Sequence, residues 1–109
     1  MVSFDMLTFD TADGSRGLTL TTLEFDSAAE AADQLGLMTS DTPGLRELPV
    51  QIGDFSFFSK VNASGFGSMV IFMKGNWVVS LHTVQADGVT PVVDTAGLET
   101  LARMIAGQL

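Results

Sequence analysis

One continuous apolar stretch, Ser68–Val84, constrains the fold of this chain more than any other feature of its sequence. It reads SMVIFMKGNWVVSLHTV, two apolar runs on either side of Gly75-Asn76. Glycine tolerates a positive φ at the first central position of a tight turn, and asparagine is among the next most tolerant residues. Gly-Asn between two apolar runs therefore predicts a two-residue β-hairpin of type I′ or II′.

Both faces of this hairpin are apolar. With Lys74 opposite Trp77, the side chains of each strand alternate between the two faces. One face then carries Phe66, Val70, Phe72, Val79 and Leu81. The other face carries Met69, Ile71, Met73, Val78 and Val84, together with Ser80 and His82. An antiparallel sheet with one solvated face would alternate apolar and polar residues, so both faces of this hairpin require cover.

The other elements follow from hydrophobic period and capping residues. Strands are expected over 2–9, 18–25 and 54–61, with a bulge at Thr21-Thr22, where the apolar phase slips by one. Ser27 and Glu30 fit a capping box for a helix over 27–36, with Gly36 as its C-terminal cap. An apolar stripe predicts a last helix over 95–108. This order, β-β-α-β-β-β-α, predicts one α+β domain over 1–109, a five-stranded antiparallel sheet with two helices packed on one face.

Two helices on one face would leave the second face of the hairpin without a partner in the same chain. Burying each of its large apolar side chains is worth ~1.5–3 kcal/mol, so leaving them exposed would be costly. A closed twofold arrangement is the commonest way for identical surfaces to cover each other, so we expect a homo-oligomer, a dimer. The candidate interface or ligand residues are Met69, Ile71, Met73, Val78, Ser80 and His82.

The segment 37–53 is irregular and supports two interpretations. Thr42-Pro43-Gly44 and Pro49 interrupt it, and it is long for a connection in a small domain. It is either a connector that crosses the sheet or a lid that turns Leu45, Leu48, Val50 and Ile52 inward. With a lid, the domain would bind a small apolar ligand above the second face, where Ser80 and His82 would supply the polar groups of the pocket.

Charge and composition exclude several function classes. Thirteen acidic residues against five basic ones give a net charge of −8, which argues against nucleic acid or an anionic membrane surface as partner. No apolar run approaches the ~18 residues of a transmembrane helix. The chain has no cysteine, so disulfides and thiolate metal sites are excluded and the compartment is left open. We expect a cytoplasmic protein if Met1 is the native start, and an envelope or extracellular one if the chain is an excised mature domain.

Catalytic motifs are sparse. His82 is the only histidine, and it shares a strand face with Ser80. A nucleophilic site would also need Asp87 or Asp94 to orient the imidazole, and the Gly-x-Ser-x-Gly elbow is absent. We expect no cofactor and no metal, because Asp10–Gly14 lacks the alternating oxygen ligands of a calcium loop. The sequence predicts a non-enzymatic binding or interaction module that self-associates, with a small enzyme using His82 as the remaining alternative.

Four segments also carry a resemblance. They are Leu23–Ala32 (a strand, Phe-Asp-Ser and an alanine-rich helix), Ile52–Ser56, Val70–Val79 and Leu101–Ile105. Together they resemble small bacterial exported or lipoprotein-type domains of unknown function, which implies a sensor or binding domain of the cell envelope. The element order is similar to that of profilin-like and longin/roadblock-like domains. These resemblances imply a fold and a binding role, but no chemistry.

Overall fold

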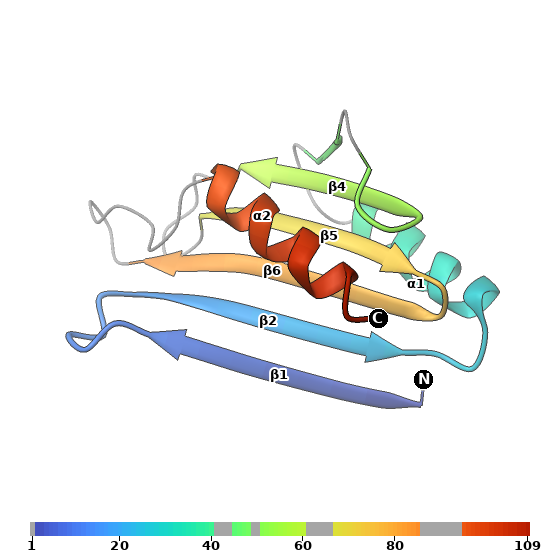
Figure 1. Cartoon of the computed structure of the whole chain (residues 1–109), viewed down its shortest axis with the longest axis horizontal. Coiled ribbons are helices and arrows are strands. Elements are labelled where there is room, and N and C mark those ends of the chain that lie inside the picture. The colour runs from blue at the N-terminus through green and yellow to red at the C-terminus, as the bar shows by residue number, and fades with distance from the viewer. Residues whose placement is uncertain (1, 41–44, 49–50, 61–66, 86–94) are drawn as a thin grey trace.

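The computed structural model describes residues 2–40, 45–48, 51–60, 67–85 and 95–109. Within these residues, six strands form one antiparallel sheet in the order β1-β2-β6-β5-β4-β3, and two helices pack against it (Figure 1). The strands are β1 (Ser3–Asp10), β2 (Arg16–Glu24), β3 (Arg46–Glu47), β4 (Phe55–Lys60), β5 (Ser68–Lys74) and β6 (Trp77–Gln85). The helices are α1 (Ala28–Ser40) and α2 (Thr95–Ala106).

The α+β class and the antiparallel sheet are as predicted, but the prediction of five strands is wrong. The sixth strand, β3, is only two residues long and pairs with β4. Two residues are too few to produce a period-2 pattern, so hydrophobic alternation cannot reveal such a strand.

The central hairpin has the predicted register, from Lys74 opposite Trp77 to Met69 opposite His82. Gly75 has a φ of +59°, and no described residue other than glycine has a positive φ. A positive φ at the first central position alone is the pattern of a type II′ turn. The Asn76 side chain donates from Nδ2 to the carbonyl of Phe25 at 2.7 Å, which ties the turn to the chain leaving β2.

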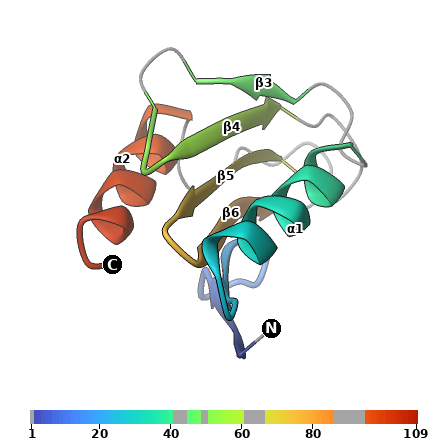
Figure 2. The same ribbon diagram turned by 90° about the vertical axis from the view of Figure 1, so that its right-hand side faces the viewer.

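The two helices lie on opposite faces of the sheet, so the prediction that both pack on one face is also wrong (Figure 2). The α2-face cluster comprises Leu48, Ile52, Val70, Phe72, Val79, Leu81, Leu98, Ala102 and Ala106. The α1-face cluster comprises Leu23, Phe25, Ala31, Leu35, Ile71, Met73 and Val78. A helix is ~10–12 Å wide and strands are ~4.8 Å apart, so one helix covers about two strands. One helix on each face therefore suffices for β5 and β6.

The prediction of a bulge at Thr21-Thr22 is wrong. The pairing of β2 with β1 and with β6 runs without interruption through Thr21 and Thr22, so there is no bulge. Instead β2 contributes Leu18 and Leu20 to the α2 face and Leu23 to the α1 face. The apolar residues of β2 change sides although the strand is regular, because its first half packs on the α2-face cluster and its end packs in the α1-face cluster.

Helix α1 begins as predicted but ends later. The Glu30 amide donates to the Ser27 hydroxyl oxygen at 3.2 Å, and the Glu30 carboxylate accepts from the Asp26 amide at 3.4 Å. The helix then passes through Gly36 without a positive φ and continues to Ser40. Met38, one turn beyond Leu35, packs against the α1-face cluster. That contact explains why the helix extends past a glycine that is unfavourable in a helix interior.

Candidate functional site

The residues predicted to form an interface or ligand site lie beneath α1. Ile71, Met73 and Val78 are 1%, 5% and 0% exposed and pack with Ala31 and Leu35 of that helix. Ser80 is buried, and Met69 and His82 are half-buried. The structure does bring the six residues onto one face, but a helix of the same chain covers the centre of that face.

His82 lies between Thr19 of β2 and Met69 of β5 in the sheet register. Burial lowers the pKa of its imidazole below the ordinary value of 6.5. The two residues expected to orient it in a catalytic site, Asp87 and Asp94, lie outside the described residues. Within the described part of the chain, no three histidine or acidic side chains gather where they could hold a metal ion. His82 is therefore a half-buried residue of the sheet face, where burial disfavours the charged imidazole.

The described residues of the segment 37–53 serve both core clusters. Residues 37–40 belong to α1, and Leu45 packs against the α1-face cluster. Leu48 and Ile52 belong to the α2-face cluster on the other side of the sheet, and Val50 lies outside the described residues. The described residues of the segment therefore contribute side chains to both faces of the sheet.

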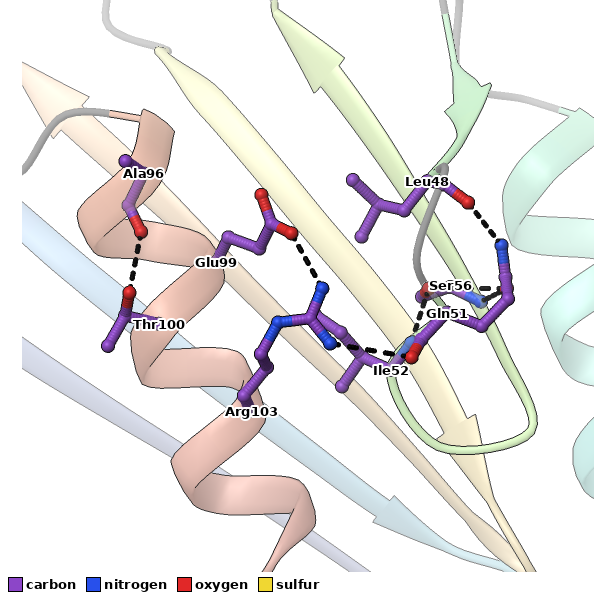
Figure 3. Close-up of polar contacts among 8 residues, drawn as sticks. All are labelled: Leu48, Gln51, Ile52, Ser56, Ala96, Glu99, Thr100 and Arg103. Atoms are coloured by element: carbon purple, nitrogen blue, oxygen red, sulfur yellow. Dashed lines mark hydrogen bonds and ion pairs between the residues drawn. The ribbon is translucent and has the colours of Figure 1, made fainter.

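A polar network fixes the end of this segment (Figure 3). Gln51 donates from Nε2 to the Leu48 carbonyl at 2.6 Å, and its Oε1 accepts from the amide of buried Ser56 at 2.7 Å. The Ser56 hydroxyl oxygen accepts from the Ile52 amide at 2.8 Å. Arg103 of α2 donates to the Gln51 carbonyl at 3.4 Å. These bonds satisfy main-chain groups and attach the end of the segment to α2.

The main exposed apolar surface follows β1 instead. Of the nine large apolar side chains that the described residues leave exposed, five lie in or beside this strand. Phe4 and Met6, on the α1 side, are 53% and 59% exposed, and Leu7 and Phe9, on the α2 side, are 54% and 57% exposed. The helices lie over β5 and β6, at a distance from β1 (Figure 1). Both faces of β1 are therefore open.

The two edges of the sheet differ in how they are protected. At one edge, β3 is two residues long and both residues, Arg46 and Glu47, are charged. At the other edge, β1 pairs with β2 over eight residues in continuous register. Short length, charged side chains, proline and bulges are the usual devices that prevent edge strands from pairing. β1 carries Asp5 and Asp10, but it is eight residues long and has no proline, lysine or bulge. Its outward N–H and C=O groups form a long, regular row that a further strand could bond.

The turn before β2 holds this edge in a defined shape. The Thr11 amide donates to the Arg16 carbonyl at 2.9 Å, and Gly14 has a φ of +69°. The Asp13 carboxylate accepts from the Thr11 hydroxyl at 2.6 Å, the Ser15 hydroxyl at 2.8 Å and the Ser15 amide at 3.1 Å. These bonds lower the pKa of Asp13 to about 2, the Thr11 bond contributing most. The turn between β1 and β2 is thus fixed by its own hydrogen bonds.

Comparison with known proteins adds no assignment: no protein-family model, curated protein or solved structure matches the chain. Neither helix in the described part of the structure is long and apolar enough to cross a membrane. The sequence analysis did not single out β1. The apolar pattern of this strand is visible in the sequence, where one face carries Phe4 and Met6 and the other carries Leu7 and Phe9. Its position at the edge is not visible there, because that depends on the order of the strands.

Proposed function

We propose that the chain is a non-enzymatic interaction module that binds a protein partner through β1. The observation that carries this proposal is the combination of an unpaired eight-residue edge with exposed apolar side chains on both faces of the same strand. Strand addition to an exposed sheet edge uses both features: main-chain hydrogen bonds supply affinity, and alternate side chains supply specificity. The surface proposed here is therefore the edge formed by β1, whereas the sequence analysis predicted the face that lies beneath α1.

The energy at stake supports a functional edge. Fully burying a large apolar side chain is worth ~1.5–3 kcal/mol. Val2, Phe4, Met6, Leu7 and Phe9 are each between 53% and 59% exposed. Together they leave roughly 4–8 kcal/mol of hydrophobic stabilisation unrealised, which is comparable to the whole stability of a small domain. A partner strand would recover part of this and would also satisfy the free main-chain groups.

An enzymatic role has weaker support. Catalysis by His82 requires a second polar group that acts on the imidazole or on a substrate. In the sheet register its cross-strand neighbours are Thr19 and Met69, and the acidic residues expected to orient it, Asp87 and Asp94, lie outside the described residues. Burial also favours the uncharged imidazole. These features are ordinary for a histidine that packs within a sheet face.

Site-specific photocrosslinking tests the proposal. Phe4 would be replaced by p-benzoylphenylalanine, and the matched control would carry the same replacement at Phe55, which lies on β4 and is 49% exposed against 53% for Phe4. Both proteins would be irradiated in extracts of cells that naturally contain the chain. The expected result is a discrete adduct from position 4 that is absent from position 55. Equal labelling from both positions, or no adduct from position 4, would contradict the proposal.

A further inference from the structure

We propose that the partner of β1 is a second copy of this chain, with the two β1 strands paired antiparallel across a twofold axis that passes beside Met6. The inference rests on the proposed function, since it names the partner of the same edge. It joins two six-stranded sheets into one continuous sheet.

The asymmetry between the two edges supports a closed pair. A sheet with two adhesive edges could pair head to tail and propagate into a filament, whereas a single adhesive edge pairs with its own copy and stops. Here β1 is long and regular, and β3 is short and carries Arg46 and Glu47. Such short, charged edges resist pairing. Among the described strands, β1 is therefore the one edge suited to pairing, and a twofold dimer leaves no such edge exposed.

The side chains of β1 select one register. With Met6 opposite the partner's Met6, Phe4 lies opposite the partner's Thr8, an aromatic and β-branched pair of the kind that stabilises antiparallel sheets. The same register places Asp5 opposite the partner's Leu7, so no like charges face each other.

The neighbouring registers are worse. Centring the pair on Asp5 brings two carboxylates directly opposite each other, which is destabilising. Centring it on Leu7 places Phe4 opposite the partner's Asp10 and Phe9 opposite the partner's Asp5. Of these three registers, the Met6-centred one alone has neither two carboxylates directly opposite each other nor an aromatic ring directly opposite a carboxylate.

The exposed area indicates a dimer of moderate strength. Aromatic side chains bury ~150–250 Å² each when covered, so Phe4 and Phe9, at 53% and 57% exposure, present roughly 200 Å² together. Adding Val2, Met6 and Leu7 brings the exposed apolar area to roughly 350–400 Å² per copy, or about 700–800 Å² for the pair, of which edge-to-edge pairing covers a part. Interfaces below ~1,200 Å² are usually weak or transient. We therefore expect dissociation constants in the micromolar range.

Charge makes this dimer dependent on salt. Each copy carries a net charge of −8, so two copies repel each other at low ionic strength. The screening length falls from about 10 Å at 0.1 M salt to about 3 Å at 1 M. Added sodium chloride should therefore tighten the dimer, which is opposite to the effect expected for a pair held by salt bridges.

The first test is sedimentation velocity from about 1 to 500 μM at two salt concentrations, with matched lysine variants. Met6→Lys places two ammonium groups opposite each other on the twofold axis. Met104→Lys, on α2, is its control, since Met104 is 64% exposed and Met6 59%. We expect the wild type and Met104→Lys to dimerise with rising concentration, and Met6→Lys to weaken the dimer at least tenfold. A wild type that stays monomeric throughout, or equal behaviour of the two variants, would overturn the inference.

The second test determines the register by disulfide formation. The chain has no native cysteine, so no other thiol can form a competing disulfide. Opposed residues of antiparallel strands lie ~4.5–5.5 Å apart at Cα, within the range that a disulfide spans. Met6→Cys should therefore crosslink to its own copy under mild oxidation far faster than Met104→Cys. Faster crosslinking of Leu7→Cys than of Met6→Cys would refute the Met6-centred register.

These results separate the failure of the dimer from the failure of the proposed function. A photoadduct from position 4 with the mass of two chains supports self-pairing. An adduct with a different protein, together with a monomeric wild type, refutes self-pairing and leaves the interaction module standing. A monomeric wild type with no adduct at position 4 refutes both.

Discussion

Replacing Leu35 by alanine tests whether α1 seals the second face of the sheet. Leu35 is 5% exposed and packs with Met73 and Val78 in the α1-face cluster. The replacement removes three carbon atoms, worth about 2.4 kcal/mol at ~0.8 kcal/mol per methylene. Incomplete collapse of the resulting space adds to this, and buried leucine-to-alanine changes cost ~2–5 kcal/mol. We expect a loss of about 3 kcal/mol in the free energy of unfolding.

Leu37→Ala is the matched control. Leu37 lies on the same helix two residues later, but it is 63% exposed. Its replacement should change the free energy of unfolding by no more than ~0.5 kcal/mol. Helix propensity affects both variants equally, so the difference between them measures burial beneath the helix.

Urea unfolding provides the assay, followed through the fluorescence of Trp77, the single tryptophan. This residue is half-buried next to the central turn, so its environment changes on unfolding. With a denaturant slope of about 1.5 kcal/mol/M, a loss of 3 kcal/mol lowers the midpoint by about 2 M. Each variant would be measured at two protein concentrations.

Two results would refute this reasoning. Equal midpoints for Leu35→Ala and Leu37→Ala would mean that α1 does not cover Met73 and Val78. A loss at Leu35 that disappears at high protein concentration would mean that a second copy, rather than α1, supplies the cover of that face.

Three further predictions concern the backbone and two titrating groups. Gly53 has a φ of +64°, and an added Cβ would lie 2.5 Å from a main-chain carbonyl oxygen of β5, so Gly53→Ala should lower the free energy of unfolding by more than ~2 kcal/mol. Gly36→Ala, in open space on α1, should be neutral or should stabilise the protein by up to ~1 kcal/mol. Equal effects of Gly53→Ala and Gly36→Ala in thermal melts would contradict the strain expected at position 53. Burial lowers the pKa of His82 in the folded state below 6.5, so the unfolded state binds the proton first. The contribution of His82 to stability is therefore full above pH 6.5 and declines as the pH falls below that value. His82→Gln should reduce the difference between the urea midpoints measured at pH 7.5 and at pH 5.5. An unchanged difference would contradict the assigned role of His82. Thr11→Val should raise the pKa of Asp13 from about 2 toward 3.8, as followed by NMR titration of the carboxyl carbon, and an unchanged pKa would contradict the assigned cause.

Local features of the sequence were sufficient for the central hairpin. Gly75 and Asn76 define the turn, and the period of two then determines which residues share a face. The structure confirms every pair from Lys74–Trp77 to Met69–His82. The start of α1 was similarly predictable, because the Ser27 and Glu30 cap acts between neighbouring residues.

The same residues could not show which helix covers which face. Alternation establishes that Met73 and Val78 lie together, but the path of the chain across the sheet depends on the order of the strands. Helix α1 connects β2 to β3 across one face, while α2 follows β6 and packs on the other. Assuming one shared face made a surface that α1 covers look free.

The amino-acid sequence by itself determined the hairpin register, the two helices and the need to cover both faces of the central strands, because these depend on contacts between near neighbours. The tertiary structure alone decided that β1 is the free edge. Phe4 and Met6 would be buried in a central strand and are exposed at an edge, although their local sequence is the same in either case. Exposure is set by which strands and helices pack alongside, and those partners come from distant parts of the chain.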